Sequence, residues 1–133
     1  MIDVYKHDNP TFGSIRIFVD ESIKKIYLAG IDICDSLGYR NNCDAINSHV
    51  PESETRMVYY EEINPTCRYL VHYRAHKYKV VTPRGVCYLL DKSRLKKNEK
   101  ILEYQDYIRS IAIPHATFGE NSVDNGRFVN LFR

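Results

Sequence analysis

Apolar and polar positions alternate near the start of the chain, as they do in a strand with one buried face. Within residues 11–19, the apolar positions that carry this pattern are Phe12, Ile15, Ile17 and Val19. A polar stretch at residues 20–22 predicts a reversal of the chain. Residues 25–28 return as a second apolar run, so the pattern predicts a β-hairpin.

The spacing becomes helical after residue 30. The apolar side chains Ile33, Cys34 and Leu37 fall on one helical face. Asp32 lies in the first turn, where a carboxylate suits the positive end of the helix dipole. Gly38 follows the last apolar residue and can adopt the positive φ that commonly ends a helix. These signals predict a short first helix.

A second short helix is predicted directly afterwards. Asn41 is a favourable N-cap, and Pro51 ends the helical stretch. The residues that share the inner face are Ala45, Ile46 and His49. Two short helices joined by a Gly-containing turn make a helix-turn-helix-like pair. In small domains such a pair most often serves to build the core.

Residues 57–62 and 67–81 are predicted as strands, with a turn at Asn64-Pro65 between them. In the second stretch, basic or histidine side chains are interleaved with aromatic ones. With a period of two, one face would carry Arg68, Leu70, His72, Arg74 and His76. A turn or bulge near residues 75–76 is needed to keep the later apolar residues inward.

Helices are predicted again after residue 81. Thr82 caps a helix with Pro83 at its first position. The charged run that follows contains Lys92, Arg94, Lys96, Lys97 and Lys100. This run is either a solvated connector or a source of phosphate contacts. Residues 101–113 have the pattern of an amphipathic helix, which Pro114 is expected to end.

These elements predict an α+β fold, with a small antiparallel sheet, a helix-turn-helix-like helix pair and a C-terminal amphipathic helix. At 133 residues, one domain is expected. We expect it to span residues 1–114, followed by a tail at residues 115–133. A turn at residues 124–126 suggests that the tail contains a short strand.

Two patches resemble a known family. The first patch comprises Leu28, Ala29, Asp32, Ile33, Cys34, Leu37, Gly38, Tyr39, Asn41, Ala45, Ile46, His49 and Val50. The second runs from residue 82 to 90 and is followed by the helix at residues 104–114. In order and spacing, these patches resemble the Bro-N domain of phage antirepressors and of the Bro proteins of large DNA viruses. The resemblance implies a DNA-binding role in viral or phage gene regulation.

The charge of the chain is distributed unevenly, although the net charge is only +2. Residues 1–63 contain 6 Lys and Arg against 11 Asp and Glu, whereas residues 64–109 contain 11 against 4. The basic half either faces a polyanion or attracts the acidic half within one domain.

The sequence shows no motif of an enzyme or of a cofactor site. A Gly-rich phosphate loop, HExxH, GxSxG and paired carboxylates are all missing, so we expect no catalysis, no cofactor and no metal. The cysteines are Cys34, Cys43, Cys67 and Cys87, and none forms a CxxC pair. Reduced thiols in an intracellular protein are therefore expected. The resemblance to Bro-N domains implies the cytoplasm or nucleus of the infected host cell. No stretch has the length and apolarity of a membrane span.

DNA binding is the leading functional hypothesis, because basic groups release counterions from phosphates and tyrosines can stack on bases. The predicted nucleic-acid-binding residues are Arg40, Arg68, His72, Arg74, Lys77, Lys79, Arg94, Lys96, Lys97 and Lys100.

The alternative is a protein-interaction module that binds a repressor or a host factor without DNA. The second helix favours this alternative, since residues 42–48 lack the Lys or Arg that many Bro-N domains carry there. The apolar tail either folds onto the core of its own domain or forms a homodimer. The predicted contacts of the homodimer are the apolar tail residues Phe118, Phe128, Val129, Leu131 and Phe132.

Overall fold

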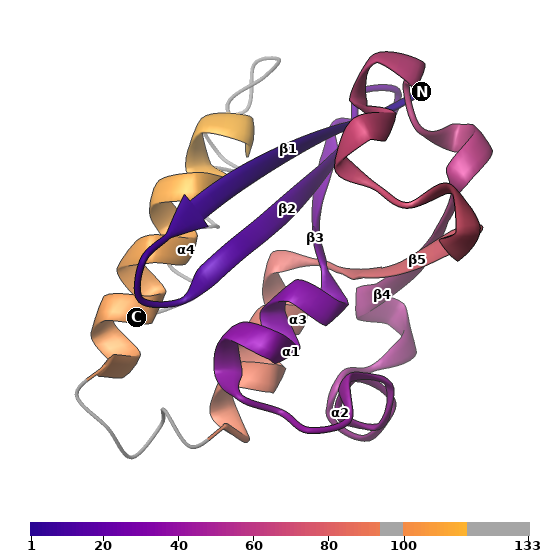
Figure 1. Cartoon of the computed structure of the whole chain (residues 1–133). Helices are drawn as coiled ribbons and strands as arrows, with labels where there is room; N and C mark the ends of the chain where they lie inside the picture. Colours follow the sequence, from indigo (N-terminus) through magenta and orange to yellow (C-terminus); the bar gives the residue numbers. More distant parts are fainter. Residues whose placement is uncertain (94–99, 117–133) are drawn as a thin grey trace.

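The computed structural model describes residues 1–93 and 100–116, which are built around a five-stranded antiparallel sheet (Figure 1). The strands are β1 (Ile2–Asn9), β2 (Gly13–Asp20), β3 (Lys25–Ala29), β4 (Thr55–Tyr59) and β5 (Lys77–Val81). Their order across the sheet is β1-β2-β3-β5-β4. The predicted hairpin is confirmed as β2 and β3, in which Phe18 lies opposite Tyr27.

Helices follow the strands along the chain. The α-helices are α1 (Gly30–Leu37), α2 (Asn42–His49), α3 (Pro83–Asp91) and α4 (Lys100–Ala116). The 3₁₀ helices are η1 (Glu52–Glu54), η2 (Tyr60–Glu62), η3 (Pro65–Leu70) and η4 (Tyr73–Ala75). In Figure 1, α4 lies along β1 and β2, whereas α1, α2 and α3 gather at the lower end of the sheet. The α+β fold class is confirmed.

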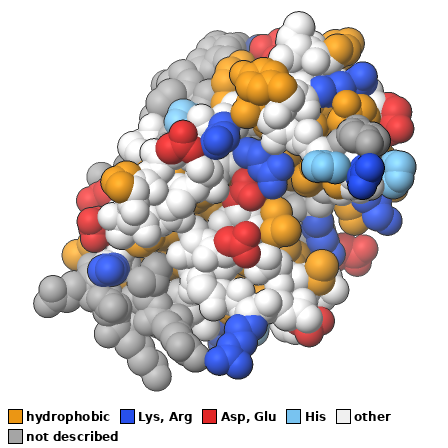
Figure 2. Space-filling view, viewed as in Figure 1, with side chains coloured by type: hydrophobic (Ala, Val, Ile, Leu, Met, Phe, Trp, Pro, Cys, Tyr) orange, Lys and Arg blue, Asp and Glu red, His pale blue; other side chains and the backbone are white. Residues whose placement is uncertain are grey.

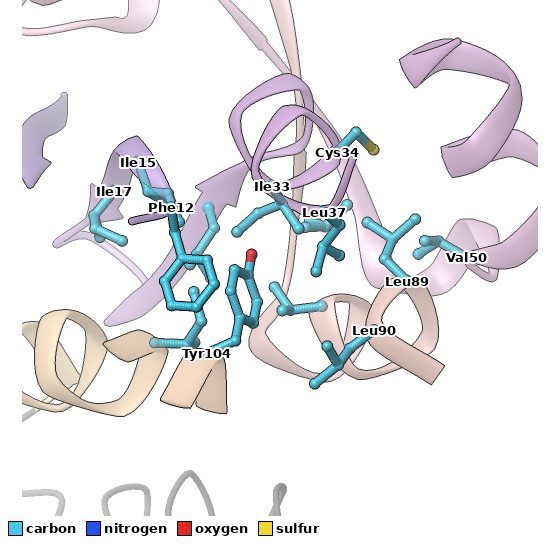
Figure 3. Packing of buried hydrophobic residues seen from close by; sticks show 14 of the residues in the cluster. Phe12, Ile15, Ile17, Ile33, Cys34, Leu37, Val50, Leu89, Leu90 and Tyr104 are labelled. Carbon is cyan, nitrogen blue, oxygen red and sulfur yellow. The ribbon is translucent and has the colours of Figure 1, made fainter. Parts of the chain in front are cut away.

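The sheet is covered on both faces. Since successive side chains of a strand point to opposite sides, each face has its own set of buried residues. On the helical side, Ile17 and Leu28 pack with Ile33 of α1, Leu89 of α3 and Tyr104 of α4 (Figure 3). The opposite face has its own apolar cluster. Its buried members are Ile2, Val4, Phe18, Tyr27, Ala29, Val58, Ile63 and Val80. The half-buried Cys67, Leu70 and Val71 of the segment around η3 cover this second cluster.

The predicted helix ends are confirmed by the capping contacts. Gly38 has φ of 82° and ends α1. The Asn41 side chain accepts the N–H of Asp44 at 3.0 Å and so caps α2. Thr82 caps α3 by accepting the N–H of Gly85 at 3.1 Å. Each cap depends on residues three positions apart, so the sequence alone was sufficient to predict it.

Gly30 lets the helix pair approach the sheet closely. A Cβ atom there would lie 2.5 Å from Cδ1 of Ile46 and 3.0 Å from the carbonyl oxygen of Lys79. The first atom belongs to α2 and the second to β5. The missing side chain at Gly30 therefore allows α1 to hold α2 against β5, which places the exposed side of α2 beside the basic part of the chain.

The strand predicted at residues 67–81 is wrong over most of its length. Only Lys77–Val81 is a strand, and η3 and η4 occupy the preceding residues. Asn64 caps η3 by accepting the N–H of Thr66, and Pro65 stands at the first position of η3. This segment turns inward to cover the second apolar cluster. It therefore cannot present the predicted basic face with a period of two.

Three further elements differ from the prediction. The strand expected at residues 57–62 is shorter, because the chain enters η2 after Tyr59. The first strand, β1, was not predicted; its alternating Ile2 and Val4 are both 2% exposed. Pro114 does not end α4, which continues to Ala116. A proline removes one main-chain donor of a helix, and the helix continues two residues beyond it.

A buried carboxylate near the end of β2 provides a pH-dependent contribution to stability. Asp20 is 6% exposed, accepts a hydrogen bond from the Ser22 hydroxyl at 2.6 Å and pairs with Arg56 at 2.8 Å. Burial acts to raise the pKa of Asp20, but the hydrogen bonds from Ser22 and Arg56 outweigh it. The pKa therefore lies below its ordinary value.

Because the folded-state pKa is lowered, Asp20 stabilises the fold above the unfolded-state pKa of about 3.9. This contribution is lost as the pH falls through the folded-state pKa. We expect Asp20→Asn to lower the free energy of unfolding by about 1–2 kcal/mol at pH 7. The difference from the wild type should shrink below about pH 4 in urea titrations. The exposed neighbour Glu21 supplies the control Glu21→Gln, and a difference that stays constant down to about pH 3 would contradict this assignment.

Candidate nucleic-acid interface

Exposed basic and histidine side chains gather just before and at the start of β5. His72, Arg74, His76 and Lys77 are all exposed, and we call residues 72–77 the basic turn. Figure 2 shows blue and pale-blue side chains gathered on the right of the molecule, at the end where this segment lies. The turn thus replaces the flat basic strand face that the sequence predicted.

Main-chain hydrogen bonds fix the shape of the basic turn. The N–H of Ala75 donates to the carbonyl of His72 at 3.0 Å, and the N–H of Arg74 donates to Nδ1 of His72 at 3.2 Å. The carbonyl of His76 accepts the N–H of Tyr60 at 2.8 Å. His76 has φ of 54°, so the chain reverses there, which confirms the break predicted near residues 75–76.

Arg68 is engaged within the fold. Its guanidinium lies 4.7 Å from the centre of the Tyr60 ring, and its Nε donates to the carbonyl of Ile63 at 3.1 Å. A second contact reaches the carbonyl of Glu61 at 3.5 Å. These contacts hold η3 against η2. Arg68 therefore has a structural role that its position in the sequence did not reveal.

Lys79 connects β5 to the second helix. Its Nζ donates to Oδ1 of Asn47 on α2 at 2.8 Å. Both side chains line a groove of about 620 Å³, together with Val50, Glu52, Thr55, Arg56 and Met57. Met57 lies opposite Lys79 in the sheet, and Tyr59 lies opposite Lys77. Directly paired residues share a face, so this face of β4 and β5 carries both apolar and cationic side chains.

Most outward-facing main-chain donors of the edge strand β4 are already used. These donors belong to Thr55, Met57 and Tyr59, since the hydrogen bonds to β5 are made by the residues that alternate with them. The N–H of Thr55 donates to the carbonyl of Glu52, and that of Tyr59 to the carboxylate of Glu62 at 2.8 Å. A partner would therefore contact the side chains of this edge strand and would not add a further strand to the sheet.

Two other predicted contacts lie away from the basic turn. Arg40 is exposed between α1 and α2, and Lys100 is exposed at the first position of α4. Figure 1 shows both of these places at the lower end of the molecule, opposite the segment that leads into β5. Arg94, Lys96 and Lys97 lie outside the described residues, as do the predicted dimer contacts Phe118, Phe128, Val129, Leu131 and Phe132.

None of the described cysteines forms a disulfide. Burial raises the pKa of Cys34 to about 12 and that of Cys87 to about 11, so both stay protonated at neutral pH. Within residues 1–93 and 100–116, no three His, Cys, Asp or Glu side chains gather closely enough to hold a metal ion. In the same part of the chain, no helix is long and apolar enough to cross a membrane.

An ion pair that no sequence pattern predicted joins α1 to β2. Asp32 of α1 binds Arg16 of β2 through two hydrogen bonds, at 2.7 Å to Nε and 2.9 Å to Nη2. The main-chain N–H of Arg16 donates to the same carboxylate at 2.9 Å. Asp32 is thus more than a helix-dipole partner. A lone arginine within an apolar strand was the available signal for such a buried partner.

These observations define the class of the protein as a small α+β domain with a helix pair, a half-buried ion pair and a basic turn held by hydrogen bonds. The family described as BRO family, N-terminal domain, matches residues 14–108, and the chain belongs to this family. The resemblance found in the sequence is thereby confirmed. Comparison with curated proteins gives no match, and comparison with solved structures gives none either.

Proposed function

We propose that this chain is a non-enzymatic DNA-binding regulatory domain of a virus or phage. In this proposal it acts inside the infected cell and contacts the phosphates of duplex DNA through the basic turn and Lys79. Membership of the BRO family N-terminal domain supports the regulatory role. The observation that carries the DNA contact is the exposure of Arg74, His76 and Lys77 on one turn whose backbone is fixed by hydrogen bonds.

The arrangement of charges favours a polyanion over an internal attraction between the two halves. Arg16 and Arg56, which belong to the acidic half, form their ion pairs with carboxylates of that same half. Arg74 and Lys77 of the basic half have exposed side chains. Exposed cations that neutralise phosphates release condensed counterions, and this release drives binding that does not depend on sequence.

Contacts to the phosphate backbone explain the binding better than base reading by α2. The exposed side chains of α2 are those of Cys43, Asp44, Asn47 and Ser48. None is an arginine or lysine that could bind guanine, and Asp44 would repel a phosphate. We therefore assign α2 to positioning Lys79, through Asn47, beside the basic turn.

Fluorescence anisotropy with labelled duplex DNA at several salt concentrations tests this proposal. For the wild type, we expect the affinity to fall with salt with a log–log slope of about −4 or steeper. The double variant Arg74→Ala/Lys77→Ala should flatten that slope by about 2, because each lost phosphate contact removes about one unit.

Arg84→Ala/Lys92→Ala is the matched control. Both residues are exposed, both belong to α3 and its C-cap, and the change in net charge is the same. We expect its slope to stay close to that of the wild type. An equal flattening of the salt slope in both double variants would mean that DNA binding depends only on the overall charge. No binding by the wild type at low salt would refute the proposal.

The groove between α2 and β4 favours the second candidate, a protein-interaction module. Met57 is 36% and Tyr59 49% exposed, and they lie opposite Lys79 and Lys77. Exposed aromatic and methionine side chains are typical of protein interfaces. A repressor or host factor would bind there through side chains. In this case Met57→Ala/Tyr59→Ala would abolish capture of the partner and leave DNA binding unchanged.

A further inference from the structure

Tyr78 occupies a central position beneath the basic turn. It lies on β5, where its ring joins the second apolar cluster, 6.0 Å from the ring of Phe18. Its hydroxyl reaches the first residue of the basic turn: it accepts the main-chain N–H of His72 and lies 3.4 Å from the carbonyl oxygen of His72. Thus one phenol joins strand β5 to the backbone of the turn.

A second group holds the Tyr78 ring in place. The guanidinium of Arg16 lies 5.2 Å from the centre of this ring and donates to the carbonyl of Leu70 at 3.3 Å. Asp32 orients the guanidinium through its two hydrogen bonds. Because the Arg16 side chain is only 18% exposed and that of Asp32 14%, their geometry is restricted by packing as well as by charge.

We propose that the Tyr78 hydroxyl is the positioning group of the basic turn, holding its cations in the arrangement that binds phosphates. In this role Arg16 and Asp32 act through Tyr78 and Leu70, so that the fold of α1 and β2 determines the shape of a DNA contact made elsewhere. Tyr78 touches no phosphate itself. This inference rests on the proposed DNA binding and adds the residue that preorganises it.

Tyr78→Phe removes the hydroxyl and keeps the ring, with its packing against Phe18 and its position under the guanidinium of Arg16. The control is Tyr69→Phe, which removes a hydroxyl from a side chain that is 82% exposed on the neighbouring η3. For each variant, hydrogen exchange of the main-chain amides is measured in the absence of DNA. Affinity for duplex DNA is then measured at several salt concentrations.

For Tyr78→Phe, we expect amide exchange to quicken by roughly fivefold to tenfold at residues 72–75, as for the loss of one hydrogen bond. Exchange in α1 and α4 should stay unchanged. Affinity for DNA should fall by about threefold to tenfold with the same salt slope, because the number of neutralised phosphates does not change. Tyr69→Phe should match the wild type in both measurements.

The outcomes separate this inference from the proposed function. If the wild type binds DNA but Tyr78→Phe leaves either the exchange of the turn or the affinity unchanged, the positioning role is overturned and DNA binding stands. A flatter salt slope in Tyr78→Phe would also overturn it, since the variant would then have lost phosphate contacts. If the wild type does not bind DNA, the proposed function fails, and the role of Tyr78 in binding fails with it.

Discussion

Asp32→Ala is expected to lower the free energy of unfolding by about 3 kcal/mol, the scale for removing one partner of a buried ion pair. The substitution would leave the guanidinium of Arg16 largely buried without its carboxylate. It would also remove the acceptor of the Arg16 main-chain N–H. The hydrogen bonds that Arg16 donates to Asp32 raise the pKa of Arg16 above its ordinary value. An arginine is charged at neutral pH even without such a partner, so the charge of Arg16 persists when Asp32 is gone. Urea denaturation followed by circular dichroism measures the effect.

Two further variants test the cause of this loss. Asp35→Asn changes an exposed carboxylate of the same helix, whose bond to the Asn42 side chain is exposed. It should cost less than about 0.5 kcal/mol. The double variant Arg16→Met/Asp32→Leu removes both charges and should recover part of the stability lost in Asp32→Ala. If the double variant is less stable than Asp32→Ala, the unpaired charge is not the main source of the loss.

Tyr104→Ala is expected to cost about 4 kcal/mol, as for large aromatic side chains removed from a core. The Tyr104 side chain is 0% exposed and is the largest fully buried side chain among the described residues. Its ring and that of Phe12 form a T-shaped pair with centroids 5.0 Å apart (Figure 3). Its hydroxyl lies 2.7 Å from that of Ser36. These contacts join α4 to the turn between β1 and β2 and to α1. Their loss should therefore separate α4 from the sheet.

Leu102→Ala is the matched control on the same helix, because Leu102 is 67% exposed. It should change the free energy of unfolding by less than about 0.5 kcal/mol. Tyr104→Phe separates the two parts of the tyrosine, since it removes only the hydroxyl and should cost about 1 kcal/mol. Equal effects of Tyr104→Ala and Leu102→Ala in urea denaturation would show that α4 does not contribute to the core as described.

The helix pair illustrates which parts of the fold could be predicted. The end of α1 at Gly38 and the start of α2 after Asn41 both follow from the residue types within one turn of the helix. The strand prediction at residues 67–81 failed for the opposite reason. Its alternating pattern is real, but Cys67, Leu70 and Val71 are needed to cover the far face of the sheet. A segment that covers a cluster of residues distant in the sequence leaves no pattern in its own sequence that would predict this role.

The residues of the candidate site also divide into those that the sequence predicted and those that it did not. Its cations could be read from the sequence, and Arg74 and Lys77 are exposed as expected. The sequence did not reveal that Arg68 is engaged with Tyr60 or that Lys79 binds Asn47, because these partners are 8 and 32 residues away in the chain. The role of Tyr78 was hidden as well, since a tyrosine in an apolar pattern usually indicates only core packing.

Short-range chemistry was therefore enough to predict the helix caps, the β2–β3 hairpin, the fold class and the family. Each depends on residue spacing or on contacts within a few positions. Tertiary packing alone determines that Asp32 pairs with Arg16, that the segment before β5 folds into 3₁₀ turns, and that its cations form a turn. The physical reason is that burial and hydrogen bonding between distant residues choose among conformations that the local sequence leaves nearly equal in free energy.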